Sequence, residues 1–87
     1  MKVGNAIIQK RMIEQYDEDN FYATYKNYRI EITTEHGFDP PDDPYIKRFM
    51  IDVISERGDG MKAVDALEDC ETIEEAIEHA LWGADLI

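Results

Sequence analysis

The sequence is poor in cysteine and in long apolar segments. It has a single cysteine, Cys70, which excludes an intramolecular disulfide and leaves no paired-cysteine metal motif. No stretch approaches the roughly 18 apolar residues that a membrane-spanning helix needs. Charges also interrupt the N-terminal stretch before it reaches the length of a signal-peptide core. We therefore expect a cytoplasmic protein that does not contact a membrane.

Basic residues are scarce as well. Nine Lys and Arg stand against 20 Asp and Glu, giving a net charge of −11. Residues 63–87 contain no Lys or Arg, and they hold eight of the acids: Asp65, Glu68, Asp69, Glu71, Glu74, Glu75, Glu78 and Asp85. The remaining 12 acids and nine bases leave residues 1–62 at only −3. Such a field repels nucleic acid and anionic lipid and attracts basic partners, although it also serves solubility alone.

Two alternating segments predict strands. Tyr28, Ile30 and Ile32 alternate with polar residues, which is typical of a strand with one buried face, and residues 21–25 extend it as the start of the same strand. Residues 49–54 alternate in the same way. The turn sequence at residues 57–60 then indicates a hairpin into a third strand near residues 61–67, although Val64, Leu67 and Cys70 also fit a helical spacing. The three prolines of residues 38–44 predict an extended loop.

The C-terminal segment predicts a helix. Thr72 and Glu75 form a capping box, in which each side chain accepts a hydrogen bond from the backbone N–H at the other's position. Gly83 is a plausible end of the helix. One stripe of the helix is apolar and should be buried: Ile73, Ala76, Ile77, Ala80, Leu81 and Ala84.

The N-terminal segment, residues 2–17, favours a helix, because five apolar residues share a broad face: Ala6, Ile8, Met12, Ile13 and Tyr16. A strand is the alternative, since Gln9 interrupts that face. With 87 residues, the chain is expected to form one small acidic α+β domain spanning residues 1–87. The predicted element order is α-β-β-β-α, with a three-stranded antiparallel sheet and helices packed on one face.

This order of elements resembles that of double-stranded-RNA-binding domains. The resemblance is topological, because Glu74, Glu75 and Glu78 stand where such a domain needs basic residues on its second helix. Fold alone therefore does not imply RNA binding here.

The most distinctive candidate site is the outer face of the C-terminal helix. Trp82 lies four residues after Glu78 and three after His79, and tryptophan is a common interface anchor. The alternative is that Trp82 folds back onto the N-terminal helix or onto residues 84–87, so its exposure decides the interpretation. The predicted partner-binding residues are Asp65, Glu68, Asp69, Glu71, Glu74, Glu75, Glu78 and Trp82.

These features favour a non-enzymatic interaction module or inhibitor that docks on a basic protein surface, for instance that of a nucleic-acid-binding protein. Carboxylates spaced along a helix and a strand can imitate the phosphate track of DNA. Small acidic DNA mimics, such as phage inhibitors of host nucleases and anti-CRISPR proteins, are similar in size and charge, which would fit a phage or mobile-element origin.

Two other functions remain open. In one, the chain is a structural module that forms a homodimer or larger oligomer through Trp82 and a sheet edge. In the other, aromatic residues interleaved with Lys26 and Arg29 stack on single-stranded nucleic acid, although the net charge opposes this. The aromatic residues concerned are Phe21, Tyr22, Tyr25 and Tyr28.

Catalytic, cofactor and metal sites are not expected. His36 and His79 have no spacing that defines a catalytic triad, and we interpret Cys70 as a buried structural thiol. Carboxylates in the proline-rich loop and in the following turn match no calcium-loop pattern: Asp39, Asp42, Asp43 and Asp59. Glu35, His36 and His79 are too sparse for zinc.

Overall fold

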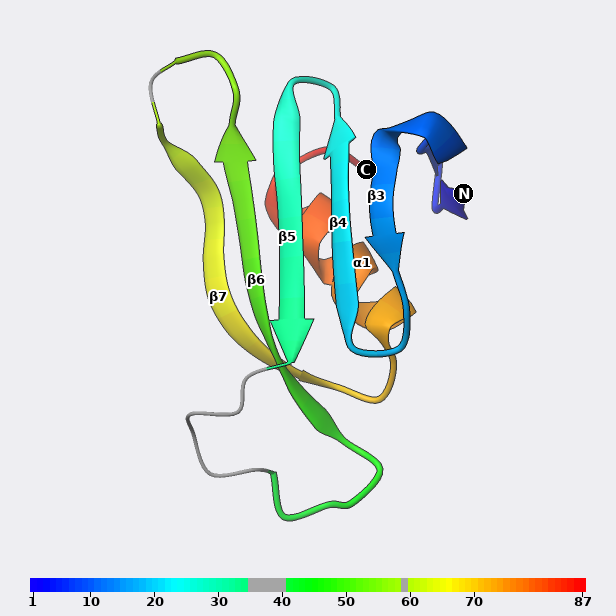
Figure 1. Ribbon diagram of the computed structural model, residues 1–87. Coiled ribbons are helices and arrows are strands. Elements are labelled where there is room, and N and C mark those ends of the chain that lie inside the picture. Colours follow the sequence, from blue (N-terminus) through cyan, green and yellow to red (C-terminus); the bar gives the residue numbers. More distant parts are fainter. Residues whose placement is uncertain (35–40, 59) are drawn as a thin grey trace.

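The computed structural model describes residues 1–34, 41–58 and 60–87. Within these residues the chain forms one antiparallel sheet of five strands, called here the main sheet. Its strands are β3 (Ile13–Tyr16), β4 (Asn20–Tyr25), β5 (Tyr28–Thr34), β6 (Lys47–Ser55) and β7 (Lys62–Cys70). They lie side by side in sequence order, with β3 and β7 at the edges (Figure 1).

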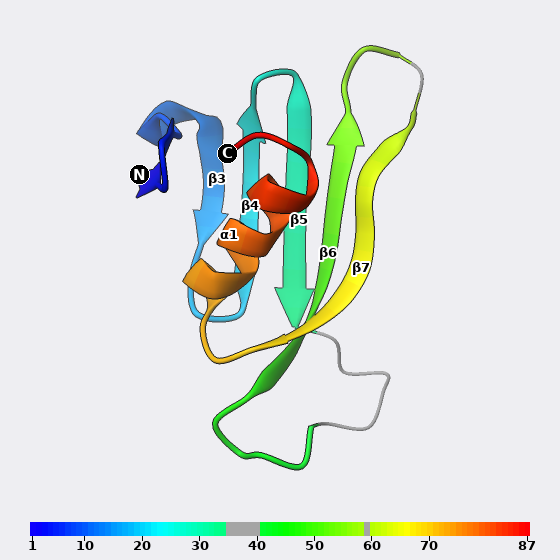
Figure 2. The same cartoon turned by 180° about the vertical axis from the view of Figure 1, so that it is seen from behind.

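A C-terminal helix, α1 (Ile73–Gly83), crosses one face of this sheet, as seen from behind in Figure 2. The opposite face, called here the open face, has no helix over it among the residues that the structure describes. Glu71 and Thr72 connect β7 directly to α1, so the helix returns at once across the sheet.

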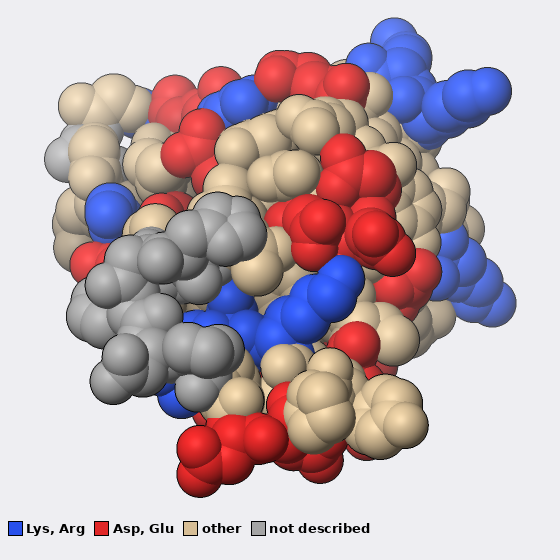
Figure 3. Space-filling view, turned by 60° about the horizontal axis from the view of Figure 1, so that its bottom comes forward, with Lys and Arg blue, Asp and Glu red and all other residues tan. Residues whose placement is uncertain are grey.

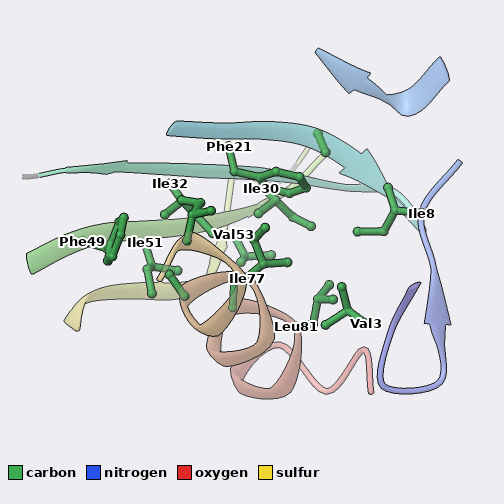
Figure 4. Packing of buried hydrophobic residues seen from close by; sticks show 14 of the residues in the cluster. Val3, Ile8, Phe21, Ile30, Ile32, Phe49, Ile51, Val53, Ile77 and Leu81 are labelled. Atoms are coloured by element: carbon green, nitrogen blue, oxygen red, sulfur yellow. The ribbon is translucent and has the colours of Figure 1, made fainter. Parts of the chain in front are cut away.

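The core fills the space between the sheet and α1. Strand residues alternate between the two faces, so Phe21, Ile30, Ile32, Phe49, Ile51 and Val53 all point toward the helix and are fully buried. Ile77 and Leu81 of α1 pack against them (Figure 4). The apolar stripe predicted for the helix is confirmed at Ile73, Ala76, Ile77, Ala80 and Leu81, which are buried, while Ala84 is half-buried.

The N-terminal segment is not a helix. It contains a short hairpin of β1 (Lys2–Val3) and β2 (Ala6–Ile7), a 3₁₀ turn at Lys10–Met12, and then β3. Gly4 makes the hairpin turn possible because its φ of +58° is one that L side chains rarely adopt. Ala6 and Ile8 are buried while Ile7 is 65% exposed, so burial here follows the period of an extended chain rather than that of a helix.

The prediction that residues 21–25 start the same strand as Tyr28 is also wrong. Residues Asn20–Tyr25 form β4, which pairs antiparallel with β5 instead of continuing into it. The chain reverses at Lys26 and Asn27, whose φ values of 49° and 67° are both positive, as in the tight turn that matches the twist of a hairpin. The sequence Lys-Asn is not the usual Asn-Gly signature of that turn.

These differences overturn the predicted α-β-β-β-α order. The part of the chain that the structure describes holds five strands in the main sheet rather than three, and one α-helix rather than two. The topological resemblance to double-stranded-RNA-binding domains therefore fails, because the N-terminal helix that it requires is replaced by β1, β2 and β3.

Other predictions are confirmed. β6 and β7 form the expected hairpin, although β7 extends to Cys70. The Thr72 hydroxyl accepts a hydrogen bond from the backbone N–H of Glu75 at 3.2 Å, but the Glu75 carboxylate accepts from the N–H of Glu71 rather than that of Thr72. Gly83 is the last helical residue, and the left-handed residue that follows is Asp85, with φ +57°.

Candidate functional site

Trp82 lies open to solvent on the outer side of α1. Its side chain is 71% exposed, which answers the question that the sequence leaves open. The buried residues Ile77 and Leu81 face the sheet, and the 100° step between helical residues places Trp82 on the opposite side. Glu78 precedes it by four residues, so the two side chains are neighbours on the helix surface.

Carboxylates precede this tryptophan along the solvent side of the helix. Together with Trp82 they form what we call the acidic helix face: Glu71, Glu74, Glu75, Glu78 and Trp82. No Lys or Arg of the described residues forms an ion pair with any of these four carboxylates. Glu74 does accept a hydrogen bond from the Tyr16 hydroxyl at 3.0 Å. Burial of the ring is the main cause of the raised pKa of Tyr16, and this hydrogen bond raises it further.

A hollow of about 430 Å³ extends this acidic surface to the turn between β3 and β4. Its lining includes Glu71 and Glu74 from the start of the helix, Asp17 and Glu18 from the turn, and the basic residue Lys47. Figure 3 views the molecule from this end, where acidic side chains gather in several clusters with uncharged surface and some Lys and Arg side chains between them. The sequence analysis did not include Asp17 and Glu18, because they lie far from the acid-rich C-terminal segment.

Asp65 and Asp69 do not belong to the acidic helix face. They alternate with inward-facing residues of β7, so they lie on the open face, on the other side of the sheet from α1. Arg48 donates two hydrogen bonds to Asp69, at 2.8 and 3.1 Å, and Lys62 lies 3.8 Å from Asp65. The predicted site is thus divided between two faces, and on the open face its charge is partly neutralised.

Glu68 and Cys70 face inward at the end of β7, where they meet the side of α1. The Sγ atom of Cys70 lies 3.7 Å from Nδ1 of His79, and a carboxylate oxygen of Glu68 lies 3.7 Å from the same nitrogen. Glu75 completes the group: one ligand atom each from Cys70, Glu75 and His79 all lie within 4.8 Å of one another. We call Cys70, Glu75 and His79 the thiol cluster.

The environment of Cys70 holds its thiol in the protonated form. Burial raises its pKa to about 11, and the carboxylates of Glu75, Glu68 and Asp69 add to that effect. The thiol is buried, as predicted for a structural cysteine. A protonated thiol is a poor nucleophile, so this arrangement does not by itself activate the sulfur.

The thiol cluster was not predicted from the sequence, because it contains neither paired cysteines nor paired histidines. The available signal was the spacing from Cys70 to Glu75 and then to His79. Glu75 and His79 are four residues apart on one helix, and they therefore share a side of it. The missing information was that β7 ends immediately beside this side of the helix.

The aromatic residues near Lys26 and Arg29 do not form one stacking surface. Phe21 is fully buried in the core, and Tyr25 and Tyr28 pack against that core from the helix side of the sheet. Tyr22 lies on the open face. Because the rings are divided between two faces, this part of the chain offers no continuous platform for successive bases.

Asp43 of the proline-rich loop has a local role. The Asp43 side chain accepts a hydrogen bond from the backbone N–H of Tyr45 at 2.9 Å, which forms a turn. Asp39, Asp59, Glu35 and His36 lie outside the described residues.

None of the helices in residues 1–34, 41–58 and 60–87 combines the length and the apolar character needed to cross a membrane. No protein-family model matches the chain, and comparisons with curated proteins and with solved structures give no match. The function must therefore be argued from the surface itself.

Proposed function

We propose that the protein is a non-enzymatic interaction module whose acidic helix face docks on a basic surface of another protein. The observation that carries this proposal is the position of Trp82. It is 71% exposed on the solvent side of the last turn of α1, and Glu78 lies one turn before it on the same side. Burying an indole ring in an interface removes a large apolar area from water at low cost in conformational entropy.

The charges around Trp82 support a basic partner. Glu71, Glu74, Glu75 and Glu78 have no Lys or Arg partner among the described residues, so a basic protein does not have to displace an existing ion pair. Complementary charge of this kind increases the rate of association and selects the partner. Asp17 and Glu18, which line the hollow beside α1, extend the negative surface potential beyond the helix.

A nucleic-acid-binding protein is one class of partner with the required surface. Glu74, Glu75 and Glu78 lie in the first half of α1, where the helical rise of about 1.5 Å per residue spaces their charges on average roughly 3 Å apart along the axis, close to the phosphate spacing along one strand of a duplex. On this proposal, bound nucleic acid and the acidic helix face compete for the same basic residues.

Affinity capture from a cell lysate tests the proposal with matched variants. Trp82→Ala removes the exposed ring, and Tyr45→Ala serves as control because Tyr45 is also exposed, by 82%, and lies outside the acidic helix face. Glu78→Lys reverses a charge beside Trp82, and Glu56→Lys makes the same change in the turn after β6.

We expect Trp82→Ala and Glu78→Lys each to weaken retention of a specific basic protein at least about tenfold, or roughly 1.4 kcal/mol, while the controls retain it. Retention should also fall as salt is added. Equal retention by all four variants would contradict the proposal. Competition by added DNA or RNA would identify the partner as a nucleic-acid-binding protein.

Self-association is measured on the same samples by light scattering. β7 is an edge strand of nine residues, and exposed edges can pair with a second copy. Its outward-facing Asp65 and Asp69 oppose such pairing through like-charge repulsion. If the protein forms a dimer and Trp82→Ala dissociates it, the partner of the acidic helix face is a second copy of the chain and not a basic protein.

A further inference from the structure

We propose that the thiol cluster, with Glu68 beside it, is a binding site for a thiophilic divalent transition-metal ion, with Zn²⁺ as the best fit. Cys70 supplies a sulfur, His79 an imidazole nitrogen and Glu75 a carboxylate oxygen, all within 4.8 Å of one another. These are the three donor types that zinc sites in proteins use.

The spacing of the donors fits tetrahedral coordination. With a Zn–S bond of about 2.3 Å and a Zn–N bond of about 2.0 Å, a tetrahedral angle holds sulfur and nitrogen about 3.6 Å apart. The Sγ atom of Cys70 and Nδ1 of His79 lie 3.7 Å apart. A metal ion can thus lie between these two atoms without movement of the backbone.

Glu68 lies beside these three donors but outside the group whose ligand atoms are all within 4.8 Å of one another, so its side chain must rotate to become a fourth donor. Its Oε2 atom lies 3.7 Å from Nδ1 of His79, on the same inward face of β7 as Cys70, two residues away. The side chains of Glu68 and His79 are 44% and 36% exposed. Water and ions therefore reach the donors from this side, while the buried sulfur forms the floor of the site.

The backbone holds the donors in place from two directions. Cys70 is anchored at the end of β7, whereas Glu75 and His79 lie one helical turn apart on α1. The backbone N–H of Glu71 donates to Oε2 of Glu75 at 3.1 Å. Hydrogen bonds of this kind orient the ligands of metal sites.

The composition of the donor set determines the metal. Thiolate and imidazole favour zinc and similar ions over Mg²⁺ and Ca²⁺, which prefer sites made of oxygen atoms. On binding, the Cys70 thiol transfers its proton to solvent and the sulfur forms a bond to the metal. The two positive charges of the ion also offset the electrostatic repulsion among the carboxylates of Glu68 and Glu75 and the new thiolate.

The test uses the full chain, purified without a polyhistidine tag and kept under reducing conditions. Co²⁺ serves as a spectroscopic probe, followed by competition with Zn²⁺. We expect one equivalent of Co²⁺ to produce thiolate-to-cobalt charge-transfer absorption and the visible bands of tetrahedral cobalt. Zn²⁺ should then remove both signals, whereas Mg²⁺ and Ca²⁺ should not.

Variants separate this site from nonspecific binding to carboxylates. Cys70→Ala should abolish the charge-transfer absorption, and His79→Gln should weaken Co²⁺ binding about 100-fold or more, an effect at or above the upper limit seen for residues that only orient ligands. Glu78→Gln is the matched control, because it removes a carboxylate from the same helix outside the cluster, and it should bind as the original chain does.

Circular dichroism of the metal-free variants establishes whether each one folds. His79 is half-exposed, so His79→Gln keeps the proposal falsifiable even if Cys70→Ala fails to fold. A folded original chain that gives no thiolate charge-transfer absorption overturns the proposal. The same conclusion follows if His79→Gln and Glu78→Gln bind Co²⁺ equally well.

Discussion

At the scale of single residues, ion pairs on the open face keep particular carboxylates ionised in the folded protein. Arg48 lowers the pKa of Asp69 through a direct side-chain hydrogen bond and through its charge. Arg29 acts in the same way on Glu14, which it contacts through two nitrogens at 2.6 and 3.0 Å. Each of these pairs therefore makes folding dependent on pH.

We predict that Asp69→Asn lowers the melting temperature at neutral pH but not in strong acid. A carboxyl group whose pKa is lowered by folding stabilises the protein fully above its ordinary pKa of about 3.9. That stabilisation is lost as the pH falls through the lowered value. Because Asp69 is exposed, the effect should be small, and thermal unfolding followed across the acid range measures it.

Glu56→Gln provides the comparison for this experiment. Glu56 is exposed, and among the described residues no ion pair involves its side chain. Its substitution should leave the pH profile unchanged. If Asp69→Asn reduces the melting temperature by the same amount at every pH, its effect does not come from the ionised pair with Arg48.

At the scale of secondary-structure elements, Gly83 determines how closely α1 approaches β7. A Cβ atom placed on Gly83 would lie 3.0 Å from Cγ2 of Val64, which is too close for an undisturbed contact. The absence of a side chain therefore allows this close packing, while the chain reversal after the helix occurs at Asp85.

We predict that Gly83→Ala and Val64→Ala are coupled. In the original background the new methyl group collides with Val64, which offsets the gain of up to about 1 kcal/mol in helix propensity. In the Val64→Ala background the space is open, so Gly83→Ala should stabilise the protein there. Denaturant unfolding of the four proteins gives the coupling, expected at about 0.5–1 kcal/mol. Strictly additive free energies would exclude a steric contact.

The elements that sequence analysis identified correctly are those with one clear period. β6 and α1 each have a regular apolar pattern, and their buried faces follow it. The prediction for the N-terminal segment failed because burial of Ala6 and Ile8 is compatible with a strand as well as with a broad helical face. The turn at Lys26 and Asn27 was not predicted because it places two non-glycine residues at positive φ. The residue types alone do not indicate this backbone conformation.

The candidate site was predictable only where it lies on a single element. Glu74, Glu75, Glu78 and Trp82 share α1, so helical geometry alone put them on its outer side. Asp65 and Asp69 were grouped with them because they are close in sequence, whereas strand alternation directs them to the open face. Predicting the thiol cluster would have required knowing that the end of β7 lies against α1.

At the scale of the whole molecule, negative charge far exceeds positive charge. The net charge is −11, and the ion pairs of the described residues lie in the sheet and the turns, apart from the contact of His79 with Glu68. Self-repulsion of this size destabilises a compact state.

We predict that sodium chloride stabilises the protein. The Debye length falls from about 30 Å at 0.01 M salt to about 10 Å at 0.1 M, so screening weakens repulsion across a molecule with extents of 37 × 26 × 21 Å. The melting temperature should rise over this range, and less steeply in Glu74→Gln/Glu78→Gln, which already carries less charge. A melting temperature that falls with salt would show that attractive ion pairs dominate.

The order of strands in the main sheet has a consequence for the speed of folding. Each strand from β4 to β7 pairs with the one before it in the chain, so hairpins can form successively and each closes a short loop at small entropic cost. The connection between β5 and β6 is the longest connection between paired strands of the main sheet. We therefore expect the β5–β6 hairpin to close more slowly than the other hairpins. A sheet built from neighbours in sequence has a low contact order, which places folding toward the fast end for proteins rich in strands.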